Sequence, residues 1–404
     1  MNVLFVYSHG VRPTQGGTER VIYLVSRALR NLGHQVYFLS LYGSVDDLDS
    51  RYNVEAPDKD DARIADFMCD VCERWGIEAV VNEIGEFCNY DIYSRIRRNK
   101  GILLISCIHF DVLGPMKYFC SDRYSRYEIR SFRACFSWLK YKWSVWRNRC
   151  QFVKGRKQVL RRMLSVSDCV VVPSEPLLHQ LRQFNKKACR IDCIHNPNFV
   201  KKNETIWPAA KRKMALYVGR LDRQKHVERI VEAWHRVREE ARDWTLIIAG
   251  AGEMESELRC QINDLQLSNV KMVGHVQDVQ ELYRLSTLAL LASDHESFSL
   301  FLMESLSYGC YPIVYDFPAA ETLIRCPEWG TRVRKHSVAC FAESLRSAIC
   351  EQRTNKLFFG DIVQYLEGFS PDVIGREWDR LLSALRQKSR VNEVEVSCLS
   401  LSRR

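Results

Sequence analysis

Two glutamates, Glu296 and Glu304, have seven residues between them. Glu296 follows a predicted strand, whereas Glu304 lies within the next predicted helix, where burial of a carboxylate is costly unless it is used. Two carboxylates at this separation could accept hydrogen bonds from both sugars of a bent nucleotide sugar. The N–H groups of Phe298, Ser299 and Leu300 lie near the start of the helix and could face the diphosphate of the nucleotide sugar. The alternative is one capping glutamate and one surface glutamate.

Two cations, Arg220 and Lys225, follow the strand predicted to end at Val218. Because both leave the same strand end, both side chains can converge on one phosphate group above the sheet. There they would neutralise the charge that develops on a departing nucleoside diphosphate. Solvated surface charge is the alternative for both residues.

Two glycines, Gly16 and Gly17, stand between the first predicted strand and the first predicted helix. Glycines there allow the backbone to approach an anion closely, and the helix N-terminus offers unpaired N–H groups. The pair lacks the full spacing of a dinucleotide-binding fingerprint. A tight turn explains it equally well.

Metal chemistry is expected to be absent from this site. Asp47 and Asp49, and likewise Asp58 and Asp60, have the Asp-x-Asp form of some metal sites, but they lie in acidic, irregular stretches. The lone pair Cys69 and Cys72 has no second pair to complete a zinc site. The sequence therefore predicts neither a metal nor another cofactor.

Strands and helices alternate along most of the chain. Strands are predicted over 3–7, 36–41, 78–81, 102–108, 169–172, 213–218, 245–249, 270–273, 288–291 and 312–314, with one more ending at Ile194. Such alternation indicates parallel sheets covered by helices on both faces. We therefore expect an α/β protein of two doubly wound, Rossmann-like domains facing a central cleft, with the ligand at the carboxyl ends of the strands.

The expected boundaries follow from the linker-like composition of residues 199–212, which interrupts the alternation. A C-terminal helix is expected to return to the N-terminal domain. The predicted parts are an N-terminal acceptor-side domain 1–198, the linker 199–212, a nucleotide-sugar-binding domain 213–368, the returning helix 369–388 and a polar tail 389–404.

Residues 116–163 form a basic, aromatic insertion in the first domain. Fourteen lysines and arginines oppose two acidic residues there, so this segment carries the whole excess of a chain whose net charge is +10. Eleven aromatic residues lie among the cations. This composition favours an anionic membrane surface, with a plain helical insertion or a nucleic-acid site as alternatives.

Composition and length exclude several classes of protein. With 404 residues, 46% of them hydrophobic, the chain is long enough for two or three domains with sizeable cores. Sixteen cysteines that are scattered without even spacing, and the lack of a signal-peptide pattern, favour a reducing, cytoplasmic setting. No apolar run approaches the roughly 18 residues that a membrane-spanning helix needs.

Taken in order, Gly16 and Gly17, then Arg220 with Lys225, then Glu296 and Glu304, resemble the motifs of the retaining GT-B glycosyltransferases of family 4. The resemblance covers nearly the whole chain. It implies that Arg220 and Lys225 bind the donor diphosphate, that Glu296 contacts the donor sugar and that Glu304 contacts the ribose.

The sequence departs from the family pattern at a few positions. His226 follows Lys225 where a glycine is usual, and Ser297 and Ser299 replace glycines that often flank the family's phenylalanine. The resemblance also implies that a His or Asp near the end of the strand 102–108 faces the reacting sugar. His109 is the better candidate here, and a core histidine is the alternative.

These observations predict a cytoplasmic enzyme at the inner face of the plasma membrane. It would transfer a sugar, with retention, from a nucleotide-sugar donor to a glycan or lipid-linked acceptor of cell-surface polysaccharide or glycolipid synthesis. The alternatives are a sugar-nucleotide epimerase or phosphorylase on the same scaffold, and a non-catalytic adaptor on a membrane or nucleic acid. No nucleic-acid partner is expected of the enzyme.

Overall fold

The computed structural model describes residues 1–11, 16–41, 53–56, 61–85, 90–96, 101–117, 132–186, 189–200, 211–334 and 337–401. These residues divide into two compact units. The first unit comprises Met1–Pro13, Val25–Ile194 and Gly375–Arg404, and the second comprises Thr14–Leu24 and His195–Ile374. The predicted domain 1–198 differs in two respects, because Thr14–Leu24 and residues 195–198 cluster with the second unit.

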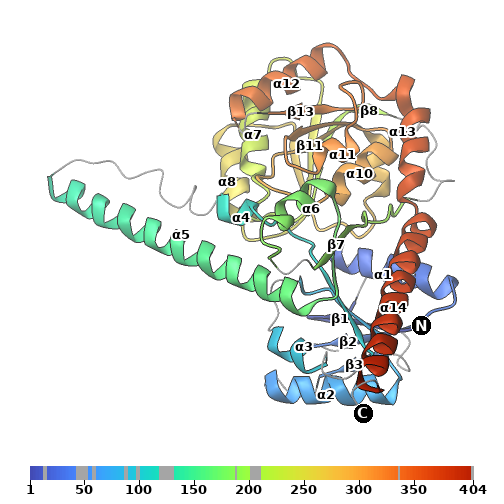
Figure 1. Ribbon diagram of the computed structural model, residues 1–404. Coiled ribbons are helices and arrows are strands. Elements are labelled where there is room, and N and C mark those ends of the chain that lie inside the picture. Colours follow the sequence, from blue (N-terminus) through green and yellow to red (C-terminus); the bar gives the residue numbers. More distant parts are fainter. Residues whose placement is uncertain are drawn as a thin grey trace. The chain divides into compact units, whose positions relative to one another are not determined.

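The first unit contains a seven-stranded parallel sheet, whose strand order is β3-β2-β1-β4-β5-β6-β7 (Figure 1). Its strands are β1 (Asn2–Tyr7), β2 (Gln35–Ser40), β3 (Asn53–Glu55), β4 (Ala79–Asn82), β5 (Leu103–Cys107), β6 (Cys169–Val172) and β7 (Arg190–Cys193). The order reverses between β1 and β4, as in a doubly wound sheet. Strands β4 and β5 are fully buried, as expected of strands covered on both faces.

Helices surround this sheet. They are α1 (Gly17–Asn31), whose first residues belong to the second unit, α2 (Asp61–Arg74), α3 (Tyr90–Ile96), α4 (Gly114–Lys117), α5 (Phe132–Val166) and α6 (Glu175–Arg182). The core includes Leu4, Val6, Val80 and Leu104, each at most 1% exposed. Burial of each such side chain contributes about 1.5–3 kcal/mol relative to exposure.

The second unit contains a six-stranded parallel sheet of order β10-β9-β8-β11-β12-β13. Its strands are β8 (Arg212–Val218), β9 (Thr245–Ala249), β10 (Val270–Gly274), β11 (Ser286–Leu291), β12 (Tyr311–Tyr315) and β13 (Thr331–Val333). Its helices are α7 (Val227–Arg236), α8 (Glu255–Asp264), α9 (Gln280–Leu285), α10 (Leu300–Ser307), α11 (Ala320–Leu323), α12 (Val338–Cys350) and α13 (Phe359–Leu366). Here the order reverses between β8 and β11, which is where ligands of such sheets bind.

The expected C-terminal helix is α14 (Pro371–Leu401), which is longer than predicted and includes most of the expected polar tail. Within the first unit, His34 Nε2 lies 3.0 Å from Asp379 Oδ1. A Cβ atom on Gly375 would lie only 2.5 Å from the Ala28 side chain. The α14 helix therefore packs closely against α1.

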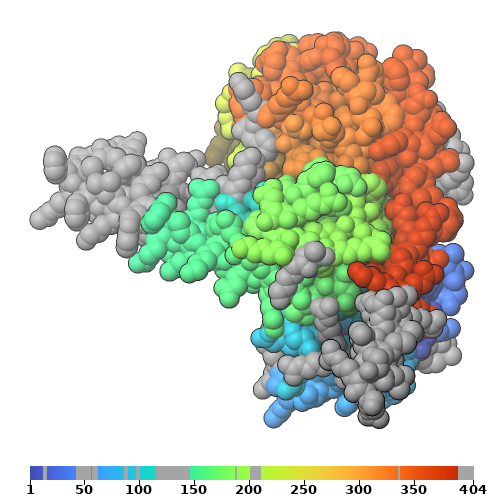
Figure 2. Space-filling view, in the orientation of Figure 1, coloured from blue at the N-terminus to red at the C-terminus, as the bar shows by residue number. Residues whose placement is uncertain are grey.

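The predicted insertion 116–163 is in part the single helix α5, and residues 118–131 lie outside the described residues. Figure 1 shows α5 extending away from the sheet of its own unit. Its described side chains begin at Trp146, and those of residues 146–152 are all exposed at the surface of this unit (Figure 2). The carboxyl end of α5 is anchored in the core by Leu160, Met163 and Leu164.

Most of the predicted linker, residues 201–210, lies outside the described residues. Arg212, at its end, already belongs to β8. No helix in the described part of the chain is long and apolar enough to cross a membrane.

Candidate functional site

Two loops at the switch point of the second sheet carry Lys225 and Glu296. Lys225 follows β8 and Glu296 follows β11, and these strands are parallel neighbours. Lys225 Nζ donates a hydrogen bond to Glu296 Oε1 over 2.6 Å. The two side chains are only 18% and 11% exposed. The pair is therefore partly withdrawn from water, where its electrostatic interaction with a third charged group is stronger than at the surface.

Arg220 follows the same strand but is held differently. Its side chain is 70% exposed and lies 3.1 Å from the Asp222 carboxylate. Its carbonyl oxygen accepts a hydrogen bond from the buried Tyr217 hydroxyl over 2.8 Å. The backbone of Arg220 is therefore fixed, while its guanidinium group lies at the surface. Arg220 and Lys225 have separate carboxylate partners rather than one shared partner.

His226 links these two loops. Its backbone has a left-handed conformation, with φ of 48°. Its Nε2 lies 2.6 Å from Asp294 Oδ2 and its Nδ1 lies 2.6 Å from Glu228 Oε1. Arg229 donates to the other oxygen of Asp294 over 2.8 Å. Burial lowers the pKa of the His226 ring, but the hydrogen bonds to Asp294 and Glu228 outweigh burial and raise that pKa to about 9.

Gln224 adds two further bonds between the loops. The side-chain amide of Gln224 donates to the backbone carbonyl oxygen of His295 over 3.0 Å. The backbone carbonyl oxygen of Gln224 accepts from the Asp294 N–H over 3.2 Å. The loops that carry Lys225 and Glu296 are therefore joined by side-chain and backbone bonds on either side of the pair. Such a framework keeps the pair in one geometry.

Glu304 lies in α10 and is 6% exposed. One of its carboxylate oxygens accepts from Arg20 over 2.5 Å, and the other accepts from the Tyr283 hydroxyl over 2.8 Å. Burial raises the pKa of Glu304, while Arg20 and the Tyr283 hydroxyl act in the opposite direction. The buried carboxylate thus has two donors that favour its ionised form.

The glycine pair lies close to the start of α10. A Cβ atom on Gly17 would lie 3.1 Å from the side chain of Leu300, so the small residue permits this approach. One helical turn later, the Arg20 guanidinium lies 4.6 Å from the centre of the Phe199 ring. The structure therefore brings the predicted glycines, Leu300 and Glu304 together within the second unit.

The start of α10 is held by its own side chains. Phe298 is fully buried, and its ring centre lies 5.6 Å from that of His195. Ser299 has a φ of 73°, and its hydroxyl accepts from the Leu302 N–H over 3.3 Å. The side chain of Phe298 thus packs in the core. The predicted diphosphate contacts of the Phe298, Ser299 and Leu300 N–H groups remain a prediction.

His109 lies in the first unit, two residues after β5. Its Nε2 is 2.5 Å from Glu83 Oε2, and the His109 and Glu83 side chains are 9% and 3% exposed. The histidine is therefore neither a solvated residue nor an apolar core residue. It is half of a nearly buried pair with a carboxylate.

The residues of these sites that were not predicted from the sequence include Arg20, Glu83, Tyr283 and Asp294. Arg20 does follow the glycine pair by one helical turn, and Glu83 follows the strand next to that of His109. Those two could have been found by asking what else stands at the same strand ends. Asp294 follows β11, the same strand as Glu296, and could have been found in this way too, whereas Tyr283 carries no such signal.

No cluster of His, Cys, Asp and Glu in the described part of the chain could hold a metal ion. Asp47, Asp49, Asp58 and Asp60, whose spacing resembles some metal sites, lie outside the described residues. Whether the reaction uses a metal therefore stays a prediction.

Family models match two segments of the chain. A model described as Glycosyltransferase Family 4 matches residues 15–197, and one described as Glycosyl transferases group 1 matches residues 201–358. The second segment includes Arg220, Lys225, Glu296 and Glu304. The first segment lies mostly in the first unit, and the second lies in the second unit.

Known proteins agree with this assignment. The amylovoran biosynthesis glycosyltransferase AmsD of Erwinia amylovora is 26% identical over 194 residues, which are 48% of this chain and about half (54%) of AmsD. An uncharacterized glycosyltransferase of Haemophilus influenzae is 23% identical over 333 residues, or 80% of this chain and 84% of that protein.

Among solved structures, the sucrose-phosphate synthase of Thermosynechococcus elongatus has a TM-score of 0.73 at 15% identity, covering 95% of this chain and 98% of its own. This likeness concerns the fold. The fold class and the family expected from the sequence are confirmed. The chain therefore belongs to glycosyltransferase family 4, with a group 1 region in its second unit, and is a glycosyltransferase enzyme of the GT-B fold.

Proposed function

We propose that this enzyme transfers a sugar, with retention of configuration, from a nucleotide-sugar donor to a glycan or lipid-linked acceptor of cell-surface polysaccharide or glycolipid synthesis. The observation that carries the proposal is the ion pair of Lys225 with Glu296 beside the switch point of the second sheet, in the same unit as the buried Glu304. The likeness to a protein named for amylovoran biosynthesis supports the class of product.

In this proposal the donor diphosphate takes the place of Glu296 as the partner of Lys225. Arg220, whose guanidinium is largely exposed, turns from Asp222 toward the same diphosphate. The two cations stabilise the negative charge that grows on the leaving diphosphate, and no metal is needed. Glu296, released from Lys225, accepts hydrogen bonds from hydroxyls of the transferred sugar.

Glu304 is proposed to accept the ribose hydroxyls. Its two donors, Arg20 and Tyr283, favour the ionised carboxylate that this role requires. A carboxylate has about four lone-pair directions, so it can keep a protein donor while accepting from a ribose hydroxyl. Because Glu304 is buried, a hydrogen bond that its carboxylate fails to make is costly. This favours a nucleoside, whose ribose hydroxyls can donate to Glu304, over a smaller phosphate ligand.

The first experiment is thermal stabilisation of the purified protein by UDP-, GDP- and ADP-sugars. A ligand at about 100 times its dissociation constant stabilises the folded protein by about 2.7 kcal/mol. We expect one nucleotide to raise the melting temperature, and the rise to be lost in Glu304→Gln but kept in Glu239→Gln, a change of an exposed glutamate. Absence of a shift with every nucleotide sugar, together with a shift by inorganic phosphate, would instead favour a phosphorylase.

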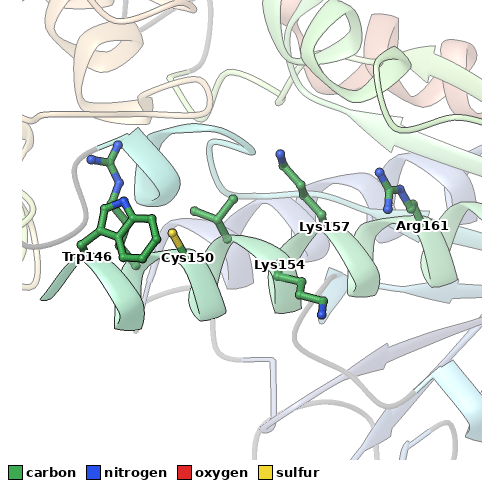
Figure 3. A pocket seen from close by; sticks show the side chains of 7 residues that line it. Trp146, Cys150, Lys154, Lys157 and Arg161 are labelled. Atoms are coloured by element: carbon green, nitrogen blue, oxygen red, sulfur yellow. The ribbon is translucent and has the colours of Figure 1, made fainter. Parts of the chain in front are cut away.

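We also propose that the enzyme is cytoplasmic and attaches peripherally to an anionic membrane through segment 116–163. Trp146, Arg149, Cys150, Val153, Lys154, Lys157 and Arg161 line a hollow of about 520 Å³ along one side of α5 (Figure 3). Trp146 is 62% exposed. Exposed cations around a tryptophan fit the headgroup level of an anionic bilayer better than a packed protein surface.

Vesicle sedimentation tests this attachment. Each cation near an anionic surface contributes about 1 kcal/mol, so changing Lys154, Lys157 and Arg161 together to Gln should weaken binding by roughly a hundredfold. The matched control changes Arg236, Arg238 and Arg242, three exposed arginines of the second unit, to Gln. Equal binding by both variants would refute the attachment, and preferential loss of RNA binding would favour the nucleic-acid alternative.

A further inference from the structure

Glu83 and His109 stand at the carboxyl ends of two neighbouring strands. Strands β4 and β5 are parallel and in register, with Asn82 opposite Ser106. The N–H of Glu83 donates to Val6 of β1 over 2.9 Å, and the N–H of Ile108 donates to Val171 of β6 over 3.0 Å. Both side chains are therefore carried by backbone that continues the sheet, which holds them more exactly in place than a loop would.

The turn that follows Glu83 is fixed by buried side chains. The Asn82 side-chain oxygen accepts from the Ile84 N–H over 3.1 Å and from the Tyr93 hydroxyl over 3.0 Å. Its amide group donates to the Tyr90 hydroxyl over 3.2 Å. Gly85 has a φ of 61°, and a Cβ atom there would lie 2.5 Å from the Cys107 carbonyl oxygen. The turn thus packs directly on the end of β5.

Glu83 receives hydrogen bonds from two groups of this sheet edge. His109 Nε2 lies 2.5 Å away, and a carboxylate can only accept, so Nε2 carries the proton. The Cys107 thiol is the second group. Burial, and then the charge of Glu83 and its hydrogen bond, raise the pKa of this thiol well above its ordinary value. The thiol is therefore a neutral donor, and Glu83 is the acceptor of both.

Asp111, the other acidic residue close to His109 in sequence, has a different use. Its carboxylate accepts from the N–H groups of Leu113 and Gly114, both over 3.0 Å. Its carbonyl oxygen accepts from Arg156 over 3.2 Å. Asp111 therefore shapes the loop that follows His109. Glu83 is the carboxylate that contacts the ring.

We infer that Glu83 is the positioning residue of His109: it accepts the Nε2 proton and so fixes the tautomer and the orientation of the ring. The assignment of His109 to the reaction rests on the proposed function. Burial of a carboxylate is costly, and replacing a buried ion pair by apolar residues of similar volume is often neutral or stabilising. What an apolar pair cannot do is select one tautomer and one orientation of the ring.

The experiment has a readout that does not depend on activity. In protein labelled with ¹⁵N-histidine, the His109 signal is assigned by its loss in His109→Gln. We expect Nε2 to carry the proton in the unmodified protein and the tautomers to mix in Glu83→Gln. Protonation at Nδ1 in the unmodified protein would overturn the inference, even if no donor supports transfer.

Kinetics give the second readout, once a donor is known. Glu83→Gln should lower kcat by at least about tenfold while the KM for the donor changes by less than about twofold. If Glu83 acts through His109, this loss should disappear when both changes are combined, so that the double variant equals His109→Gln alone. An unchanged loss in the His109→Gln background would show that Glu83 has only a structural role.

Two further proteins keep the test decisive. Glu73→Gln, a change of an exposed glutamate on α2, is the matched control and should keep the kcat, the KM and the melting temperature of the unmodified protein. If Glu83→Gln does not fold, Glu83→Asp withdraws the carboxylate from the ring while keeping its charge, and it carries the same expectations. Failure of transfer with every donor would refute the proposed function, and the ¹⁵N spectra would still decide the pairing.

Discussion

Replacing His226 with glycine should destabilise the second unit near neutral pH and cease to do so in alkaline solution. The His226 ring contacts the carboxylates of Asp294 and Glu228, and Arg229 pairs with Asp294. The hydrogen bonds to the two carboxylates outweigh the effect of burial. They hold the pKa of the ring at about 9, against an ordinary 6.5. Because the folded protein favours the protonated ring, the stabilisation is complete below pH 6.5. It is lost as the pH rises through about 9.

The magnitude follows from these values. The difference between a pKa of about 9 and one of 6.5 corresponds to about 3 kcal/mol. Glycine also removes the cost of a left-handed backbone, about 1 kcal/mol for a side-chain-bearing residue. The net loss at pH 6.5 is therefore about 2 kcal/mol, or a melting temperature lower by about 4–8 °C for a unit of this size. At pH 10 glycine should be neutral or slightly stabilising.

Calorimetric scans at pH 6, 7, 8, 9 and 10 measure this difference for His226→Gly against the unmodified protein. His275→Gln, a change of an exposed histidine in the same unit, is the control and should show no such pH dependence. The reasoning fails if His226→Gly loses the same stability at pH 6 and pH 10. It fails equally if the variant loses none at pH 6, because the ring would then not be acting as a paired cation.

Two further changes test the proposed donor site. Lys225→Ala should lower kcat by roughly a hundredfold, the usual effect of removing one group that stabilises transition-state charge, and it should slow transfer more than it weakens folding. Turnover at the normal rate would refute the phosphate role. Tyr283→Phe removes one donor to Glu304, so the pKa of that carboxyl should rise further and nucleotide binding should weaken most at acidic pH. Calorimetric titrations at pH 5.5 and 8 measure this, and a loss that is equal at both would contradict it.

The sequence predicted the central parts of both sheets because their strands are continuous apolar runs. An apolar run that is bounded by turn residues and followed by helical periodicity is typical of a buried strand. It did not predict β3 and β13, which contain three residues each and lie at sheet edges. A strand that short carries too few residues for a pattern, and its pairing is decided by the strand beside it.

The candidate site, too, could be predicted only in part. Glu296 and Glu304 could be placed in a loop and in the following helix, because those positions depend only on local sequence. The partners of Glu304 could not, since Arg20 is 284 residues away along the chain and Tyr283 lies on a different helix. Partners at such distances are set by the packing of whole elements. No local pattern in the sequence shows that these residues contact Glu304.

The two departures at left-handed positions show what replaces a family glycine. His226 and Ser299 both have positive φ, so each carries a backbone cost of about 1 kcal/mol that glycine would avoid. Each side chain also makes a bond that glycine cannot make: Ser299 caps α10 through the Leu302 N–H, and His226 joins Asp294 to Glu228. The departures therefore give up backbone freedom and gain a fixed geometry on both loops of the proposed donor site. A glycine at either position should restore the usual family residue and at the same time loosen the loop that carries Lys225 or the start of α10.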